Sequence, residues 1–279
     1  MVLMAFRKIS LDDFIDTKRQ ITDISSKRLV VLGENAKLID VLNIFFSEKV
    51  RKIPIVDKFG NLKGMVSSID ILSMFGGGEK YEILTKNRES MKIKVTKFAT
   101  RHVKTIHFRT PIKKSLETFK AERSGLYPLV DSKKIISVVS EWDFVKLIDK
   151  PVGIRIGQVM VERPIFVQRD YNVYDVAKMM CRGGFRRLPV VEDNILLGVV
   201  TPTDILLHLK ENKMLDSLVS DKTRIEKIMN REVITADADA DLFSAASIMT
   251  SKHVGGLPVT DEEELIGIVT ERDIVDALI

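Results

Sequence analysis

The stretch Gly198-Val199-Val200-Thr201-Pro202-Thr203-Asp204 places a short apolar run directly before Thr-x-x-Asp. Two β-branched apolar residues after a glycine are typical of a short buried strand. Thr-x-x-Asp is close to the Ser/Thr-x-x-Glu pattern with which many helices begin. The stretch therefore predicts a strand that runs straight into a helix, and we call this strand-to-helix turn a corner.

The corner occurs four times in the chain. Corners 1 to 4 are defined by their hydroxyl and carboxylate residues, which are Ser67 and Asp70, Ser140 and Asp143, Thr201 and Asp204, and Thr270 and Asp273. A glycine stands three residues before the hydroxyl in corners 1, 3 and 4, whereas corner 2 has Ser137 there. Four copies of one turn predict four copies of one structural unit, with the second as the most divergent.

The spacing around the corners supports a tandem repeat. The stretches Ile21–Asp70, Val95–Asp143, Ile156–Asp204 and Ile225–Asp273 have nearly equal lengths. Each has the order strand, helix, apolar-Pro-apolar strand, turn, strand and helix, with helical spacing such as Leu38, Val41, Leu42 and Phe45. The repeat is longer than those of most solenoids, so each copy is expected to carry its own sheet in an α/β fold.

The repeats set the expected boundaries. We expect repeats 1 to 4 at 21–75, 93–148, 155–209 and 224–279, an N-terminal lead-in at 1–20, and joins at 76–92, 149–154 and 210–223. The early strands are expected at 29–32, 103–106, 164–167 and 233–236. Leu11, Phe14 and Ile15 predict a short helix in the lead-in, the glycines at 76–78 predict a flexible first join, and the polar third join is expected to be helical.

Composition narrows the class of protein. The 279 residues are 45% hydrophobic and 30% charged, as in soluble globular proteins, and no apolar run is long enough to span a membrane. The start lacks a secretory h-region, and the single cysteine, Cys181, suits a reducing compartment, so a cytoplasmic location is expected. The net charge of +5 suits an anionic small ligand or an acidic partner and is weak evidence for nucleic acid.

No catalytic pattern stands out in the sequence. The four histidines, at positions 102, 107, 208 and 253, lack metal-ligand spacing, so we expect no metal site. Cys181 lies beside Met180 on an apolar helix face and is expected to be a packing thiol. Neither a nucleophile–base set nor a phosphate-binding glycine loop is found, so the chain is not expected to be an enzyme.

The order of elements, with apolar-Pro-apolar-apolar followed by Gly-apolar-apolar-Ser/Thr-x-x-Asp, resembles the CBS domain. The resemblance covers roughly 21–279. Four such repeats in one chain are similar to the γ subunit of AMP-activated protein kinase and its free-standing archaeal relatives. It implies two Bateman modules, formed by repeats 1 with 2 and 3 with 4, that pack as a flat disc. It also implies a monomeric disc or a homodimer.

The same resemblance implies ligands and site residues. Each cleft between paired repeats is expected to hold AMP, ADP, ATP or S-adenosylmethionine, as a ligand rather than an obligatory cofactor. The corner Asp is expected to bind the ribose diol, and the corner hydroxyl is expected near the phosphates. The early strand is expected to frame the adenine, through Val31, Thr105, Phe166 and Thr235.

Elementary chemistry agrees with these roles. A carboxylate can accept hydrogen bonds from both hydroxyls of a cis-diol, and a helix N-terminus favours an anion. The basic pairs Arg51-Lys52 and Arg186-Arg187 directly precede the proline strands, where γ subunits carry a phosphate-contacting pair. Gly125-Leu126 and Gly255-Gly256 stand there in repeats 2 and 4, so phosphate binding by those positions is not expected.

The sequence leaves rival functions open. The favoured hypothesis is a non-catalytic sensor of adenine nucleotides that regulates a partner such as a kinase. Its alternatives are a regulator that binds S-adenosylmethionine, for which the arginine pair would be irrelevant, and a ligand-free scaffold for dimerisation or partner docking. Each corner is also expected to cap its helix, and the arginine pair has the alternative role of a solvated charge pair.

Overall fold

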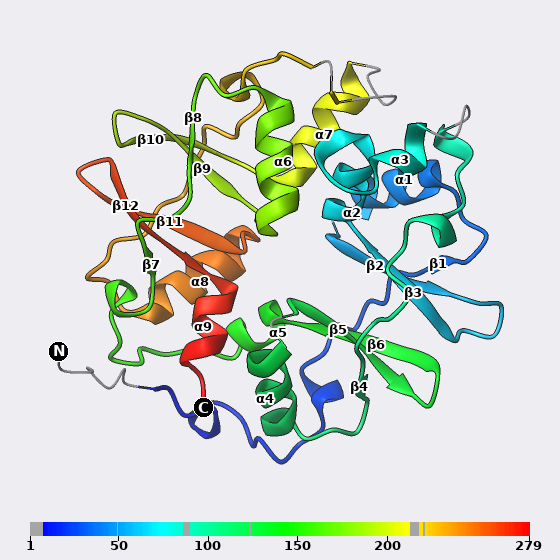
Figure 1. Ribbon diagram of the computed structural model, residues 1–279. Helices are drawn as coiled ribbons and strands as arrows, with labels where there is room; N and C mark the ends of the chain where they lie inside the picture. The colour runs from blue at the N-terminus through cyan, green and yellow to red at the C-terminus, as the bar shows by residue number, and fades with distance from the viewer. Residues whose placement is uncertain (1–7, 49, 86–89, 123, 213–217, 220) are drawn as a thin grey trace. The chain divides into compact units, whose positions relative to one another are not determined.

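The computed structural model describes residues 8–48, 50–85, 90–122, 124–212, 218–219 and 221–279. In every repeat a long helix is followed by an antiparallel hairpin and then by a second helix, as Figure 1 shows. Repeat 1 contains β1 (Leu32–Gly33), α1 (Leu38–Glu48), β2 (Lys52–Val56), β3 (Leu62–Ser67) and α2 (Ser68–Leu72), followed by α3 (Tyr81–Thr85). Repeat 2 contains β4 (Ile106–His107), α4 (Ile112–Glu122), β5 (Leu126–Asp131), β6 (Lys134–Ser140) and α5 (Glu141–Val145).

The second half of the chain repeats this order. Repeat 3 contains β7 (Val161–Glu162), β8 (Val167–Gln168), α6 (Val173–Gly183), β9 (Leu188–Glu192), β10 (Ile195–Val200) and α7 (Pro202–Glu211). Repeat 4 contains α8 (Leu242–Lys252), β11 (Gly256–Asp261), β12 (Glu264–Thr270) and α9 (Glu271–Ala277). The predicted fold class, tandem α/β repeats, is confirmed.

The long helix of each repeat has one buried face. In α1 the residues Leu38, Val41, Leu42 and Phe45 are buried, at the spacing of one helical stripe. The helices α4, α6 and α8 bury residues at the same relative positions. In each unit these buried helix residues share one hydrophobic core with buried residues of the hairpins.

The early strands are shorter than predicted and lie closer to the C-terminus. Leu32 pairs in parallel with Ile55, and the residue before it would pair with Pro54. Proline has no N–H group to donate to a ladder, so the parallel pairing cannot extend in that direction. The equivalent prolines limit β4 and β8 in the same way, and in repeat 4 only the bridge between Ala236 and Val259 forms.

The chain divides into two compact units. The odd unit comprises Val30–Val103 and Ile165–Val233, and the even unit comprises the described residues up to Leu29 with Lys104–Pro164 and Ile234–Ile279. Each unit has its own hydrophobic core. In the odd unit α2 packs against α7, and in the even unit α5 packs against α9. We call the long helix, hairpin and second helix of a repeat its body. The body of repeat 1 thus packs with the body of repeat 3, and the body of repeat 2 packs with the body of repeat 4.

The opening segment of each repeat packs on the body of its neighbour in sequence. We use this term for 21–26, 93–100, 154–162 and 223–230. In the odd unit, Val95 N donates to Ala36 O at 2.8 Å and Leu38 N donates to Ile93 O at 2.9 Å. In the even unit, Ile21 N donates to Thr110 O at 2.8 Å. Repeats 1 and 2 thus exchange their opening segments, while their pairing as one module stays a prediction.

Repeats 3 and 4 exchange their opening segments in the same way. Ile156 N donates to Ala240 O at 2.9 Å in the even unit. Ile225 N donates to Tyr171 O at 2.8 Å in the odd unit. The opening segment of each repeat therefore packs on the body of the neighbouring repeat in sequence and not on its own body.

The motif glycine allows this crossing. A Cβ atom on Gly198 would lie 2.8 Å from Asn230 O and 2.7 Å from Met229 Sδ, and one on Gly64 would lie 2.9 Å from Thr100 O. In repeat 2 the equivalent position is Ser137, whose hydroxyl donates to Ser26 O in the crossing segment at 2.6 Å. The glycine is therefore a packing position, and the serine replaces close approach by a hydrogen bond.

Two predictions about the joins need correction. Gly76 and Gly77 are buried instead of forming a flexible join: a Cβ on Gly77 would meet Cys181 Sγ of α6 at 2.9 Å, and one on Gly76 would meet Val219 Cγ2 at 2.8 Å. The lead-in helix is limited to a single 3-10 turn, Leu11–Asp13. The predicted helix over 210–223 is wrong beyond the end of α7: among the described residues, 212, 218–219 and 221–223 form turns, bends or irregular backbone, while 213–217 and 220 lie outside those described.

Candidate functional site

All four corners form a reciprocal capping arrangement. In corner 3, Asp204 Oδ2 accepts hydrogen bonds from Thr201 N and Thr201 Oγ1, both at 2.7 Å. Oδ2 of the corner Asp accepts the same pair of bonds in corners 1, 2 and 4. The capping role expected beside ligand binding is thus present in each repeat. The hydroxyl proton of Thr201 is committed to Asp204, so donating to a phosphate would require this arrangement to open.

The second carboxylate oxygen separates the corners into two kinds. Asp70 Oδ1 accepts a hydrogen bond from Lys80 Nζ in corner 1, and Asp143 Oδ1 lies 2.9 Å from Lys146 Nζ in corner 2. No donor from the described residues reaches Oδ1 of Asp204 or of Asp273, and neither atom is sealed from solvent. We call corners 1 and 2 closed and corners 3 and 4 open.

Burial changes the electrostatics of the open corners. Desolvation raises the pKa of Asp204 above its usual value, although the hydrogen bonds from Thr201 act in the opposite direction. Desolvation likewise raises the pKa of Asp273, against hydrogen bonds from Thr270. In the ionised state each open corner therefore holds a half-buried carboxylate with one uncommitted oxygen, which favours a ligand that donates hydrogen bonds.

The basic residues predicted for phosphate binding lie beside corners of their own repeats. Lys52 pairs with Ser67 across the β2–β3 ladder, so the two side chains share one face. Leu188 pairs with Val200, which places Arg187 next to Thr201 in the same register. Arg51 and Arg186, one residue further back, are exposed. In repeats 2 and 4 the equivalent ladder positions next to the corner are Leu126 and Gly256.

The four residues predicted to frame adenine occupy one structural position. Each directly precedes the residue that pairs in parallel with the proline strand. Val31 is half-buried, Thr105 and Thr235 are exposed, and Phe166 is 40% exposed. This position leaves the side chains accessible, and their contact with adenine stays a prediction.

The roles of Lys80 and Lys146 were not predicted from the sequence. Lys146 stands three residues after Asp143 on one helix, and that spacing alone could have indicated the ion pair. Lys80 is ten residues from Asp70 and follows the glycines that were expected to be flexible. Only the buried turn at 76–78, which no pattern in the sequence predicts, brings Lys80 to the corner.

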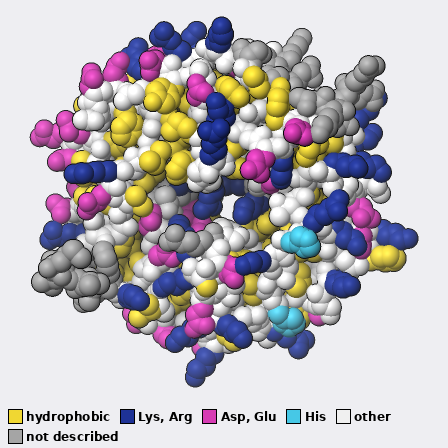
Figure 2. Space-filling model, viewed as in Figure 1, with side chains coloured by type: hydrophobic (Ala, Val, Ile, Leu, Met, Phe, Trp, Pro, Cys, Tyr) yellow, Lys and Arg dark blue, Asp and Glu magenta, His cyan; other side chains and the backbone are white. Residues whose placement is uncertain are grey.

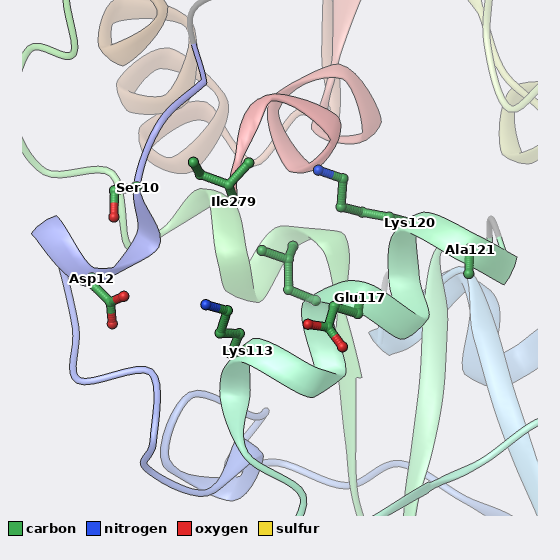
Figure 3. A pocket seen from close by; sticks show the side chains of 8 residues that line it. Ser10, Asp12, Lys113, Glu117, Lys120, Ala121 and Ile279 are labelled. Atoms are coloured by element: carbon green, nitrogen blue, oxygen red, sulfur yellow. The ribbon is translucent and has the colours of Figure 1, made fainter.

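Other candidate sites carry less chemistry. A pocket of about 620 Å³ in the even unit lies between α4 and the residues around Ser10 and Asp12, and none of its lining residues is a corner hydroxyl or carboxylate (Figure 3). Its lysines, Lys113 and Lys120, are accompanied by the acidic Asp12 and Glu117, so the pocket has no single preference for charge. Burial raises the pKa of the Cys181 thiol to about 12, which makes it a poor nucleophile.

The described residues also limit metals and membranes. They include no group of three or more His, Cys, Asp or Glu side chains arranged to hold a metal ion. In the described part of the chain, every helix is too short or too polar to cross a lipid bilayer. On the face shown in Figure 2, basic and acidic side chains are interspersed, without the basic stripe typical of nucleic-acid binding.

Comparison with known proteins agrees with the geometry. The CBS domain matches the chain at 21–77, 95–150, 156–211 and 225–279. Protein MJ1225 of Methanocaldococcus jannaschii is 32% identical over 266 residues, which cover 90% of this chain and 95% of that protein. The crystal structure of MJ1225, described as a proposed archaeal homolog of γ-AMPK, gives a TM-score of 0.86 at 31% identity and covers 92% of this chain and 99% of that one.

Two further relatives span similar lengths. A 33.4 kDa protein of the ribosomal RNA operon of Thermofilum pendens is 26% identical over 90% of this chain and 88% of its own length. A crystal structure from Pyrococcus horikoshii shares the fold, with a TM-score of 0.61 at 21% identity over 92% of this chain and 98% of that one. With four matches that together span most of its length, the chain belongs to the CBS-domain family.

Proposed function

We propose that this protein is a non-catalytic regulator that binds adenine nucleotides, with the ribose held at the open corners 3 and 4. The observation that carries the proposal is the uncommitted Oδ1 of Asp204 and of Asp273. Membership of the CBS-domain family and the similarity to MJ1225, described as a proposed homolog of γ-AMPK, support a regulatory role. The regulated partner would be a protein such as a kinase.

The capping arrangement prepares the carboxylate for a diol. Because Oδ2 is held by two bonds from Thr201, the side chain of Asp204 has little freedom left to lose when a ligand binds. A ribose offers two adjacent hydroxyl donors, and hydrogen bonds to a charged acceptor are the stronger class. A rigid, half-buried carboxylate with a free oxygen fits that donor pair better than it fits an anion.

The basic residues favour a phosphorylated ligand. Arg187 lies beside corner 3 and Lys52 lies beside corner 1, each next to the corner hydroxyl in the ladder. A phosphate near Thr201 would thus meet a guanidinium, which forms strong paired hydrogen bonds with phosphate oxygens. S-adenosylmethionine has no phosphate and would make no use of this charge, which is why AMP, ADP or ATP is preferred.

The test is a calorimetric titration of the whole protein with AMP, ATP, S-adenosylmethionine and 2′,3′-dideoxy-AMP. Wild type should bind AMP and ATP more tightly than the dideoxy analogue, because the analogue lacks the donors for Asp204 and Asp273. Release of phosphate from ATP by pure protein, lost when a corner Asp is changed, would contradict the non-catalytic role. Tighter binding of S-adenosylmethionine than of any nucleotide would replace the proposed ligand.

The phosphate contact has its own variant. Arg186→Ala combined with Arg187→Ala should weaken AMP and ATP binding and leave adenosine binding nearly unchanged. Higher salt should weaken nucleotide binding to wild type, because partly exposed charge pairs are screened. Equal losses for adenosine and AMP would show that the arginines support the fold instead.

A further inference from the structure

We propose that Lys80 is a built-in occupant of corner 1, where it takes the place that a ribose takes at corners 3 and 4. This inference rests on the proposed function, because it assumes that a free corner Asp binds ribose. It goes further because it assigns different roles to the four corners and names the residue that prevents one corner from binding a nucleotide. Corner 1 would then hold no nucleotide while Lys80 is in place.

The backbone before Lys80 fixes its position. Gly76 has φ +119°, a conformation that other residues rarely adopt, and it turns the chain back after Phe75. A Cβ on Gly78 would lie 2.6 Å from Ser73 Oγ, so only glycine passes Ser73 at this distance. Lys80 N donates to the same Ser73 Oγ at 3.0 Å. The lysine is therefore placed over α2 by its backbone before its side chain makes any contact.

The ammonium group joins two parts of the odd unit. Lys80 Nζ donates to Asp70 Oδ1 and, at 2.8 Å, to Phe98 O in the opening segment of repeat 2. The side chains of Lys80 and Asp70 are 29% and 16% exposed, so water screens this pair only in part. A ribose that took Asp70 Oδ1 would displace the ammonium from its carboxylate, and two neutral hydroxyls do not replace a positive charge.

Lys146 makes a looser contact in corner 2. It belongs to the same helix as Asp143, its side chain is 44% exposed, and its contact with Asp143 Oδ1 is an ion pair of the i, i+3 type. No second acceptor among the described residues holds its ammonium. Lys80 is distinct because the chain brings it from outside the corner and holds it with a backbone carbonyl as well.

The experiment counts AMP sites by calorimetry in the full chain. Lys80→Met keeps the apolar stem and removes the charge, and it should add one AMP site to the wild-type number. Asp70→Ala in the Lys80→Met background should remove that added site. Lys63→Met is the matched control, since Lys63 also faces an Asp of repeat 1, Asp57 at 3.6 Å, and it should leave the number unchanged.

Two results would overturn the inference. One is an unchanged number of AMP sites in Lys80→Met, and the other is the loss of a site when Asp70→Ala is made in wild type. Both differ from failure of the proposed function, which would show as no AMP binding by wild type at all. Lys80→Gln repeats the count if Lys80→Met does not fold.

A measurement without nucleotide tests the contact itself. In urea titrations, Lys80→Met should lower the unfolding midpoint in wild type and should lower it less in an Asp70→Asn background, because the partner charge is already gone. Equal shifts in the two backgrounds would show that Lys80 and Asp70 do not act together and would overturn the inference.

Discussion

Corner 3 and corner 1 share the same capping bonds and differ in what lies around the second carboxylate oxygen. Oδ1 of Asp204 meets no described donor, whereas Oδ1 of Asp70 meets the ammonium of Lys80. Corners 4 and 2 repeat the contrast with Asp273 and Asp143. Four copies of one motif have thus acquired two kinds of surroundings, and the difference comes from residues outside the motif.

The presence of an adjacent basic side chain groups the corners differently. Lys52 and Arg187 lie beside corners 1 and 3, while Leu126 and Gly256 take the equivalent positions beside corners 2 and 4. Among the described residues, corner 3 is the one corner that combines, within its own repeat, a carboxylate oxygen that meets no donor with an adjacent basic residue. We therefore expect the variants of corner 3 to show the largest effects.

The sharpest test of the comparison replaces the carboxylate in each kind of corner. Asp204→Ala should weaken AMP binding at one site by roughly 10- to 100-fold, since bonds to a charged acceptor are worth about 1.5–3 kcal/mol. Asp70→Ala should leave AMP binding unchanged, because Lys80 already occupies its oxygen. Titration with AMP and with 2′,3′-dideoxy-AMP measures both.

The stability of each variant in the absence of ligand separates ligand binding from capping. Loss of a cap alone costs about 0.5–2 kcal/mol of unfolding free energy and is expected in both variants. If Asp204→Ala still prefers AMP over the dideoxy analogue as strongly as wild type does, the ribose assignment is wrong.

A second test asks whether an open corner depends on the opening segment that crosses behind it. Gly198→Ala should lower the free energy of unfolding by about 1–3 kcal/mol, because its Cβ would meet Asn230 O and Met229 Sδ. Gly33→Ala is the control, since a Cβ there meets nothing within 4 Å. Urea titration gives the values, and equal midpoints for the two variants would contradict the packing role.

Acidification offers a test that needs no large structural change. Burial raises the pKa of Asp204 and of Asp273, so each folded carboxyl takes up its proton at a higher pH than the unfolded chain does. The raised pKa of a neutral, buried carboxyl contributes to the free energy of unfolding. This contribution is present below the usual pKa of 3.8 and is lost as the pH rises through the raised pKa. The ionised acceptor for ribose exists only above that raised pKa.

Adenosine binding should therefore weaken as the pH falls through the raised pKa of the open corners. Adenosine is used because it has no phosphate to titrate. Titrations at a series of pH values should show this loss in wild type and a flatter profile when Asp204→Asn and Asp273→Asn are combined. Identical profiles for the two proteins would assign the pH dependence to other groups.

The smallest effect is expected at corner 2. Lys146→Met removes an ion pair whose lysine is 44% exposed, and such pairs contribute about 0–1 kcal/mol to stability. The unfolding midpoint in urea should thus stay close to that of wild type. A loss well above this range would show that Lys146 supports the corner more strongly than an exposed pair does.

The repeated parts of the fold were predictable because each is local in sequence. Leu38, Val41, Leu42 and Phe45 give the buried face of α1 by helical spacing alone, and the corner places its own capping partners three residues apart. The early strands of repeats 1 to 3 begin three residues later and end one residue later than predicted, because the missing N–H group of a proline such as Pro54 limits the ladder and hydrophobicity does not report it.

The contact that closes corner 1 depends on a turn of the chain between its two residues, unlike the local i, i+3 pair of Asp143 and Lys146 in corner 2. Lys80 reaches Asp70 only because buried glycines reverse the chain, and their composition indicated a flexible join instead. The grouping of repeats 1 with 3 and 2 with 4 depends on helix contacts such as those of α2 with α7. No pattern within one repeat reports which other repeat its last helix will meet.

The exchange of opening segments has a consequence for synthesis on the ribosome. The odd unit draws on residues from Val30 to Val233, so its core cannot close until the opening segment of repeat 4 has been translated. The body of repeat 1, with α1 and its hairpin, is translated early. More than half of the chain remains to be translated at that point, so this body cannot yet pack into the complete core. Proteins otherwise tend to fold domain by domain from the N-terminus as they emerge. Here a nascent chain stalled after repeat 2 should remain sensitive to protease in both units, and protection should arrive first in the odd unit and last in the even unit.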